Sequence, residues 1–212
     1  SLYGITSYDR LVEEKIPTVL IHDVYDSRIP IVDVDNYMGG RLVADHLVKR
    51  KIKNFAVFVG ENGFRTDDMR LKGFHEGLKD HGIDVRQNCL IFRLSLTTEN
   101  TAFEEGYKIG KTFAFKELGI QGVFMFNDLL AMGFQKAVLE RGMKIPEDIA
   151  IVGFDNIDRC AEARVSLTTV ESPRLAIGET AFSLLLELVQ KKRFTDVRNI
   201  FIKPKLIIRD SA

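Results

Sequence analysis

Short apolar runs alternate along the chain with longer segments in which apolar residues recur every three or four positions. Apolar runs of this kind, bounded by glycine or polar residues, are typical of strands buried on both faces of a parallel sheet. They predict strands at residues 2–6, 16–21, 31–34, 55–59, 89–94, 123–126, 149–152, 200–202 and 206–208. Because such strands alternate with helices in parallel βαβ units, the pattern predicts an α/β fold.

The segments between these strands carry the spacing of amphipathic helices. This spacing predicts helices at residues 36–50, 66–81, 100–118, 128–141 and 173–191. Residues 36–164 hold four βα units, which are enough for one complete doubly wound lobe. The segments outside this region supply too few elements to close a second sheet. We therefore expect the chain to begin in the middle of a lobe.

The charge of the chain argues against direct contact with nucleic acid. Lys and Arg number 30, as do Asp and Glu, so the formal net charge is zero, whereas nucleic-acid-binding chains usually present a basic face. The basic residues at 49–53 lie at an expected helix end, where cations complement the helix dipole. No apolar run approaches the ~18–20 residues of a membrane span. We expect no membrane association of this chain.

The cysteines and histidines indicate no metal, redox or cofactor chemistry. Cys89 and Cys160 are far apart and fit no zinc or redox spacing. Two cysteines used in this way are consistent with a reducing cytoplasm. His75 and His81 lie six positions apart on one expected helix, which is not the spacing of metal ligands on one face. The sequence predicts neither a metal nor a cofactor.

Polar residues follow several of the expected strands at their carboxyl ends, where open α/β sheets bind ligands. Asp155 follows the strand at 149–152, and Asn127 and Asp128 follow the strand at 123–126. Asp128 is expected to cap the helix that it begins, which favours Asn127 as the ligand-binding member of the pair. Asp155 is a candidate acceptor for ligand hydroxyls, with a turn-stabilising role as the alternative.

Arg70 is expected near the start of a helix that follows the strand at 55–59. Its planar guanidinium suits adjacent hydroxyls or a carboxylate, and the alternative is a surface ion pair with Asp67 or Asp68. Phe64 lies in the preceding loop, where its ring either stacks on the apolar face of a sugar or packs into the core. Asp23 follows the strand at 16–21 and is either a hydroxyl acceptor or a turn residue.

Several motifs, in order along the chain, resemble those of the LacI/GalR family of bacterial transcription regulators. The run Ile-Ala-Ile-Val-Gly-Phe-Asp-Asn at 149–156 is similar to that family's signature strand. Further matches are Arg-x-x-Gly-Phe at 70–74, Asn-Asp-x-x-Ala-x-Gly at 127–133, Thr-Thr-Val at 168–170 and Leu-Ile-Ile-Arg-x-Ser at 206–211. Each motif alone is weak, but together they cover essentially the whole chain at the family's spacing.

The resemblance implies two Rossmann-like lobes of the periplasmic-binding-protein type I fold, joined by three crossing segments. On this basis residues 1–35 plus 171–196 form a partial N-terminal lobe, and residues 36–170 plus 197–212 form the C-terminal lobe. The family binds its effector between the lobes. The N-terminal lobe is expected to be incomplete, and the helix-turn-helix domain that precedes this region in the family is not found in the sequence.

The resemblance further implies an effector-sensing and dimerisation core, with a sugar as the expected small-molecule effector. Arg70, Asn127, Asp155, Phe64 and Asp23 are the candidate effector-binding residues. Where purine-responsive relatives have an arginine six positions before the motif arginine, this chain has Phe64, which argues against a purine effector. Operator DNA would be contacted only through the missing domain, by a cytoplasmic homodimer.

Two other functions compete with this interpretation. A periplasmic sugar-binding protein of a transporter shares the fold, but the segments at 168–170 and 206–211 are regulator-like. An α/β enzyme would need catalytic residues that the sequence does not show. The loop Gly60-Glu61-Asn62-Gly63 lacks the lysine and the glycine spacing of a phosphate cradle, and no nucleophile elbow is found. The sequence therefore predicts a non-enzymatic sensor.

Overall fold

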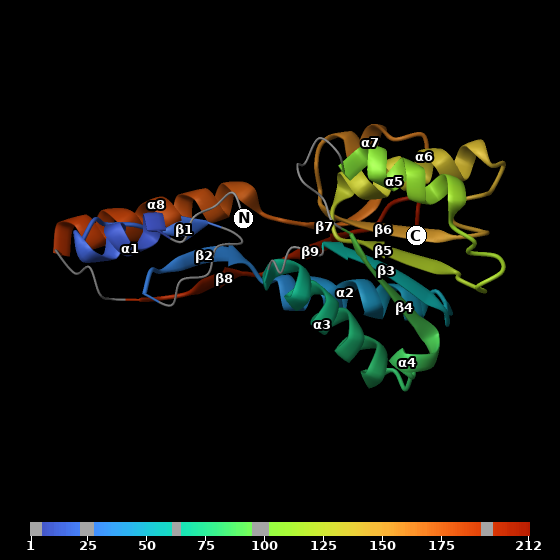
Figure 1. Cartoon of the computed structure of the whole chain (residues 1–212), viewed down its shortest axis with the longest axis horizontal. Coiled ribbons are helices and arrows are strands. Elements are labelled where there is room, and N and C mark those ends of the chain that lie inside the picture. Colours follow the sequence, from blue (N-terminus) through green and yellow to red (C-terminus); the bar gives the residue numbers. More distant parts are fainter. Residues whose placement is uncertain (1–5, 22–27, 61–64, 95–101, 192–196) are drawn as a thin grey trace. The chain divides into compact units, whose positions relative to one another are not determined.

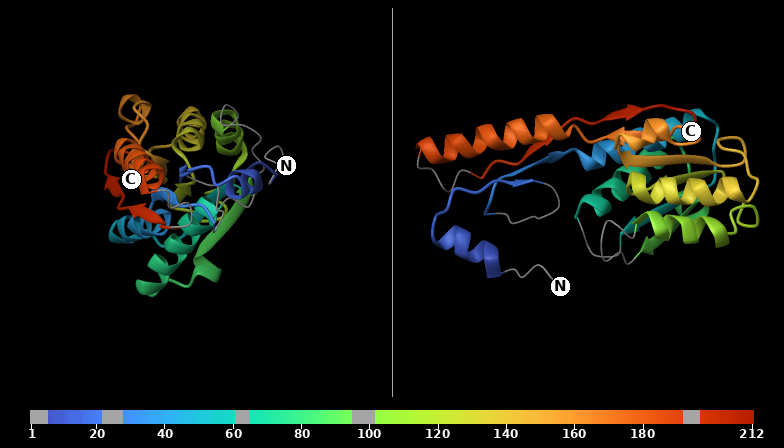
Figure 2. Two further views of the ribbon diagram at one scale, coloured as in Figure 1. Left: turned by 90° about the vertical axis from the view of Figure 1, so that its left-hand side faces the viewer. Right: turned by 90° about the horizontal axis from the view of Figure 1, so that it is seen from above.

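The computed structural model describes residues 6–21, 28–60, 65–94, 102–191 and 197–212 (Figures 1 and 2). The chain forms two compact units, and it passes from one to the other three times. Unit 1 comprises Ser1–Asp35 and Pro173–Lys203, and unit 2 comprises Asn36–Ser172 and Pro204–Ala212. Residues 197–203 thus lie in unit 1, whereas the division expected from the sequence placed them in the C-terminal lobe.

Unit 2 is built on a six-stranded sheet with the order β4-β3-β5-β6-β7-β9. All neighbouring strands are parallel except β7 and β9, which are antiparallel. The strands are β3 (Phe55–Gly60), β4 (Cys89–Leu94), β5 (Gly122–Met125), β6 (Ala150–Asp155), β7 (Thr168–Glu171) and β9 (Lys205–Ile207). The predicted α/β class and the four predicted parallel strands of this sheet are confirmed.

Helices cover both faces of this sheet (Figure 1). The helices α2 (Asn36–Lys49), α3 (Arg65–Asp80) and α4 (Val85–Asn88) lie on one side. The helices α5 (Ala102–Thr112), α6 (Asp128–Glu140) and α7 (Arg159–Glu162) lie on the other. The central strands are therefore buried on both faces, as their uninterrupted apolar sequences require. Every residue of β3 and of β5 is buried.

The close packing of α2 against α3 depends on residues without side chains. A Cβ atom at Gly73 of α3 would lie 1.9 Å from the carbonyl oxygen of Tyr37 on α2. A Cβ atom at Gly40 of α2 would lie 2.0 Å from the carbonyl oxygen of Arg70 on α3. No larger residue fits either position unless the helices separate. This contact holds the backbone of Arg70 against α2.

Helix α5 ends earlier than the predicted helix at 100–118, of which residues 100 and 101 lie outside the described residues. Phe113 and Phe115, which follow α5, turn inward and pack with Phe134. The guanidinium of Arg141 donates hydrogen bonds to the carbonyls of Gly110 and Phe113 at 2.8 and 2.9 Å. These carbonyls at the helix end are thereby satisfied without a further turn of helix.

Unit 1 contains a three-stranded parallel sheet with the order β1-β2-β8. Its elements are α1 (Thr6–Glu13), β1 (Leu20–Ile21), β2 (Ile31–Val34), α8 (Arg174–Lys191) and β8 (Ile200–Ile202). The pairing of β8 with β2 is the reason that residues 200–202 belong to this unit. Helix α8 buries Ile177, Ala181, Leu184 and Leu188.

One strand prediction in unit 1 needs correction, and another falls almost entirely outside the described residues. Of the strand predicted at 2–6, only Thr6 is among the described residues, and it begins helix α1. The strand predicted at 16–21 is reduced to Leu20 and Ile21, the two residues that pair with β2. Residues 16–19 have no regular structure, and the hydroxyl of Thr18 donates to the carbonyl of Ile16 at 2.9 Å. No helix in the described part of the chain is long and apolar enough to cross a membrane.

Candidate functional site

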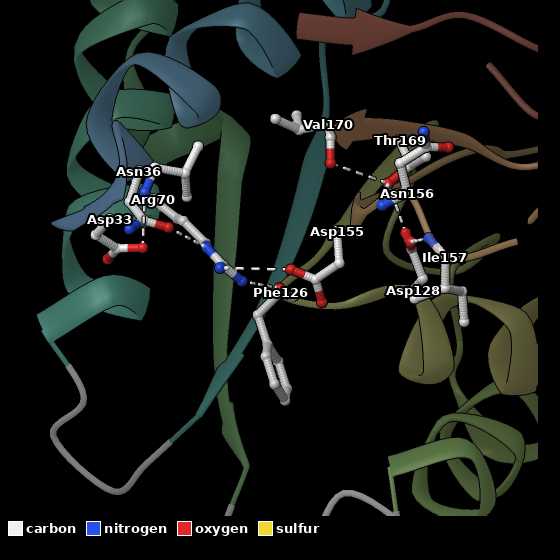
Figure 3. Close-up of polar contacts among 11 residues, drawn as sticks. Asp33, Asn36, Arg70, Phe126, Asp128, Asp155, Asn156, Ile157, Thr169 and Val170 are labelled. Atoms are coloured by element: carbon white, nitrogen blue, oxygen red, sulfur yellow. Dashed lines mark hydrogen bonds and ion pairs between the residues drawn. The ribbon is translucent and has the colours of Figure 1, made fainter. Parts of the chain in front are cut away.

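Candidate ligand-binding residues meet at the carboxyl ends of the strands of unit 2 (Figure 3). Arg70 comes from the second turn of α3, which follows β3, and Asp155 is the last residue of β6. In the close-up the two side chains point toward one another, and an Arg70 Nη2 to Asp155 Oδ1 distance of 3.7 Å makes them an ion pair. This is the edge at which parallel α/β sheets bind their ligands.

Arg70 is held by several neighbours rather than by the surface ion pair considered as its alternative. Its Nε donates to Asn36 Oδ1 at 2.8 Å, and its Nη1 donates to the carbonyl of Phe126. The guanidinium carbon lies 3.6 Å from the ring centroid of Phe154, a cation–π distance. Only 11% of the Arg70 side chain is exposed, compared with 34% for Asp155. The arginine is thus fixed, and the carboxylate is the more accessible partner.

The backbone at Asp155 and Asn156 has an unusual conformation. Both residues have positive φ angles, +111° and +54°, although neither is glycine. Such conformations cost on the order of 1–3 kcal/mol each and persist only where surrounding contacts impose them, and they are frequent at ligand sites. The turn therefore directs the Asp155 carboxylate at a cost that other interactions offset.

The side chain of Asn156 makes some of the contacts that stabilise this turn. Its Oδ1 accepts a hydrogen bond from Arg209 at 2.8 Å, and its Nδ2 lies 3.4 Å from Glu171 Oε1. Arg209 also donates to the carbonyl of Leu167 at 2.7 Å. Sequence reasoning missed Arg209 as a support of this turn, although it had noted the motif that contains it.

The helix-capping role predicted for Asp128 belongs to Asn127. Asn127 is the residue that caps α6, because its side chain accepts a hydrogen bond from the amide of Leu130 at 2.9 Å. Asp128 is 1% exposed and bonds instead to residues beyond β6. Its Oδ1 accepts from the hydroxyl of Thr169 at 2.5 Å, and its Oδ2 accepts from the amide of Ile157 at 2.9 Å.

The electrostatics of Asp128 follow from these contacts. Burial raises the pKa of Asp128 above its ordinary value, and the hydrogen bonds from Thr169 and Ile157 oppose that rise. Burial, followed by the nearby Asp128 carboxylate, raises the pKa of Cys160, so this thiol is not a nucleophile at neutral pH. Asp128 is therefore a structural carboxylate beneath the candidate site.

Two candidates lie outside the described residues, namely Asp23 and Phe64. Among the remaining three, the structure brings together Arg70 and Asp155, and Arg70 also bonds to the carbonyl that precedes Asn127. Asn36 and Phe154 were not expected here. Phe154 precedes Asp155 in the signature strand, and Asn36 begins α2, so only their places next to predicted features could have indicated them.

Chemically, the arrangement suits recognition rather than bond breaking. A fixed guanidinium beside a partly exposed carboxylate presents charged donors and acceptors to neighbouring hydroxyls. Within the described ranges, no group of three or more His, Cys, Asp or Glu residues could hold a metal ion. The geometry therefore fits a polyhydroxylated small molecule.

Comparisons with known proteins identify the family to which this chain is similar. Residues 44–212 match the family model described as a periplasmic binding protein-like domain. The chain is 30% identical over 204 residues to the arabinose metabolism transcriptional repressor of Geobacillus stearothermophilus, covering 93% of this chain and 54% of that protein. It is 31% identical over 180 residues to the HTH-type transcriptional repressor PurR of Yersinia pestis, covering 84% and 51% respectively. The chain thus spans about half the length of the curated relatives it matches.

Solved structures give the same result. A LacI family transcriptional regulator from Enterococcus faecium with bound ribose superposes with a TM-score of 0.85 at 25% identity, over 99% of this chain and 75% of that one. A LacI family regulator from Enterococcus faecalis, also with bound ribose, gives a TM-score of 0.81 at 27% identity, over 100% and 74%. The fold is shared with these proteins.

Proposed function

The chain belongs to the periplasmic binding protein-like family, as the effector-binding core of a LacI-type regulator, and we propose that its effector is a sugar. We infer further that it forms a homodimer and that sugar binding controls contact with operator DNA through a helix-turn-helix domain. Binding that favours one conformation of the regulator over another would couple the two events. Such a regulator works in the cytoplasm and catalyses no reaction.

The observation that carries the proposal is the pairing of buried Arg70 with partly exposed Asp155 at the ligand-binding edge of unit 2. A sugar offers vicinal hydroxyls that can donate to the carboxylate and accept from the guanidinium. Asn127 adds an amide group, since its Oδ1 is engaged in capping α6 and no partner of its Nδ2 is found in the described part of the chain. The ribose bound by two structural relatives makes a pentose the first ligand to test.

The transporter alternative is less well supported. The two curated relatives and the two superposed structures described above are transcription regulators by name. The motifs at 168–170 and 206–211 serve unit 2 directly, because Ser211 Oγ accepts from the Thr168 amide at 2.8 Å and donates to the Ile151 carbonyl at 2.7 Å. We therefore favour a regulator.

Replacing Asp155 by alanine should weaken sugar binding while leaving the protein folded. Loss of one charged hydrogen-bond partner costs about 1.5–3 kcal/mol, or roughly ten- to a hundredfold in affinity. Isothermal titration of the protein at its full natural length with ribose, arabinose and xylulose measures this change. A purine base serves as the contrasting ligand.

Asp148→Ala is the matched control, because Asp148 lies just before the opposite end of the same strand and accepts from the Lys144 amide at 2.8 Å. The Asp148→Ala variant should bind the sugars with the same affinity as the wild type. Equal binding by the Asp155 variant and the wild type would refute the assignment of this site. Binding of none of the sugars would refute the proposed effector class.

The chain alone should associate but should not bind DNA in a salt-dependent manner. Phosphate contacts require several Lys or Arg residues on one face, whereas the formal charge of this chain is balanced. Sedimentation at micromolar concentration should show a dimer, and titration with duplex DNA at low salt should show no binding that is lost on adding salt. A strict monomer would contradict the dimer, and operator binding by the chain alone would contradict the need for a separate DNA-binding domain.

A further inference from the structure

The turn at the end of β6 is stabilised by hydrogen bonds from residues on other elements of unit 2. Asp155 and Asn156 both have positive φ angles, and the next amide, that of Ile157, donates to Asp128 Oδ2 at 2.9 Å. Asp128 begins α6, which follows β5, the neighbour of β6 in the sheet. The carboxylate therefore bonds to the chain directly after its strained residues.

The second oxygen of Asp128 extends this support to β7. Its Oδ1 accepts a hydrogen bond from the hydroxyl of Thr169 at 2.5 Å. Thr169 Oγ1 in turn lies 3.4 Å from the amide nitrogen of Asn156. The Asp128 carboxylate thus bonds to the Ile157 amide, and it interacts with the Asn156 amide both directly and through Thr169. It also interacts with the Cys160 thiol. Figure 3 shows these groups gathered on the side of the turn away from Arg70.

Asp128 cannot act on a ligand directly. It is 1% exposed and both of its oxygens are occupied, whereas the Asp155 side chain is 34% exposed and faces Arg70. The hydrogen bonds of Asp128 and Thr169 reach the backbone amides of Ile157 and Asn156, next to Asp155. Asp128 can therefore influence ligand binding through the conformation of the turn.

We propose that Asp128 is a positioning residue, which fixes the left-handed turn at Asp155–Asn156 and so presents the Asp155 carboxylate to the effector beside Arg70. The proposal rests on the proposed sugar-binding function for its consequence, but not for the conformation of the turn. A competing explanation makes Asp128 merely an acid in the first turn of α6, where a negative charge favours the helix dipole. The two explanations differ in what an uncharged residue at this position does.

The experiment compares Asp128→Ala with Asp128→Asn in the protein at its full natural length. Asparagine retains one acceptor for the Ile157 amide and offers an NH2 group to Thr169 Oγ1, so the turn should persist without the charge. Alanine removes all of these contacts. Positioning predicts ribose affinity within about threefold of wild type for asparagine and at least tenfold weaker for alanine. A helix-dipole role predicts that both variants lose thermal stability equally and that neither loses affinity.

A second readout does not depend on any ligand. Amide hydrogen exchange should accelerate at Asn156 and Ile157 in Asp128→Ala, and should stay close to wild type in Asp128→Asn. If wild-type protein binds no sugar, the proposed function fails while this exchange measurement still decides the role of Asp128 in the turn. A folded alanine variant with unchanged exchange at Ile157 would overturn the proposal.

Two further variants test the proposal in case Asp128→Ala does not fold. Thr169→Val keeps the shape of the side chain and removes the hydroxyl between Asp128 and Asn156, so it should raise exchange at Asn156 and weaken ribose binding about threefold. Asp84→Asn is the matched control, because Asp84 also accepts a backbone amide, that of Arg86 at 2.9 Å, but at the start of α4. It should change neither quantity. Unchanged exchange at Asn156 in Thr169→Val would contradict the link through Thr169.

Discussion

Alanine at Gly73 should destabilise unit 2 by about 3 kcal/mol or more, an effect at the upper end of those seen for overpacking. The new Cβ atom would stand 1.9 Å from the Tyr37 carbonyl oxygen, which belongs to helix backbone and cannot rotate away. The gain of about 1 kcal/mol in helix propensity when alanine replaces glycine is too small to compensate. Urea unfolding followed by far-ultraviolet circular dichroism measures the loss, since the chain has no tryptophan.

Gly178→Ala provides the matched control. Gly178 also lies inside a helix, α8, but a Cβ atom there would meet nothing within 4 Å. This variant should be neutral or slightly more stable than wild type. A Gly73 variant as stable as the Gly178 variant would show that α2 and α3 are not held at the observed separation. Because Gly73 and Arg70 share one helix, the Gly73 variant should also bind sugar more weakly.

The second large effect is expected at Arg70. Alanine there removes the partner of Asp155 and the donors to Asn36 and the Phe126 carbonyl together. Truncation of a buried, hydrogen-bonded charge commonly costs about 3 kcal/mol, or roughly a hundredfold in affinity. Titration with ribose should show this loss, and thermal unfolding should show a lower melting temperature for the variant.

Lysine at the same position separates charge from geometry. Arg70→Lys keeps the positive charge beside Asp155 but cannot reach several acceptors at once, because it lacks the planar fork of donors. We expect it to recover part of the stability and little of the affinity. Full recovery of affinity by lysine would mean that charge alone, and not the fixed orientation shown in Figure 3, recognises the effector.

The strands were predictable where short apolar runs are bounded by polar residues. Residues 31–34, which are buried throughout, form a strand with the predicted bounds. Residues 89–94 do so as well, although they form an edge strand that is mostly exposed or half-buried. The stretch at 16–21 is also apolar, but a strand needs a partner, and only Leu20 and Ile21 pair with β2. The single-turn helices α4 and α7 were not predicted, since four residues carry too little periodicity to be distinguished from a turn.

The location of the candidate site could be predicted from the sequence, but the hydrogen bonds among its residues could not. Arg70 and Asp155 could be chosen because strand ends and motifs identify them without knowledge of their neighbours. Asn127 and Asp128 have nearly equal preference for capping a helix, so local sequence cannot decide between them. Their roles are decided by Thr169 and Ile157, which lie far along the chain and come close only in the folded sheet.

The order of synthesis constrains this molecule in an unexpected way. Strand β9 completes the sheet of unit 2 beside β7, yet the whole of α8 and β8 is translated between them. Arg209, which bonds to Asn156 at 2.8 Å, follows β9. Although domains usually fold in the order in which the ribosome delivers them, a nascent chain that has released β3 to β7 still lacks that anchor. We therefore expect nascent fragments that end in α8 to lack both β9 and this contact to the turn of the proposed site.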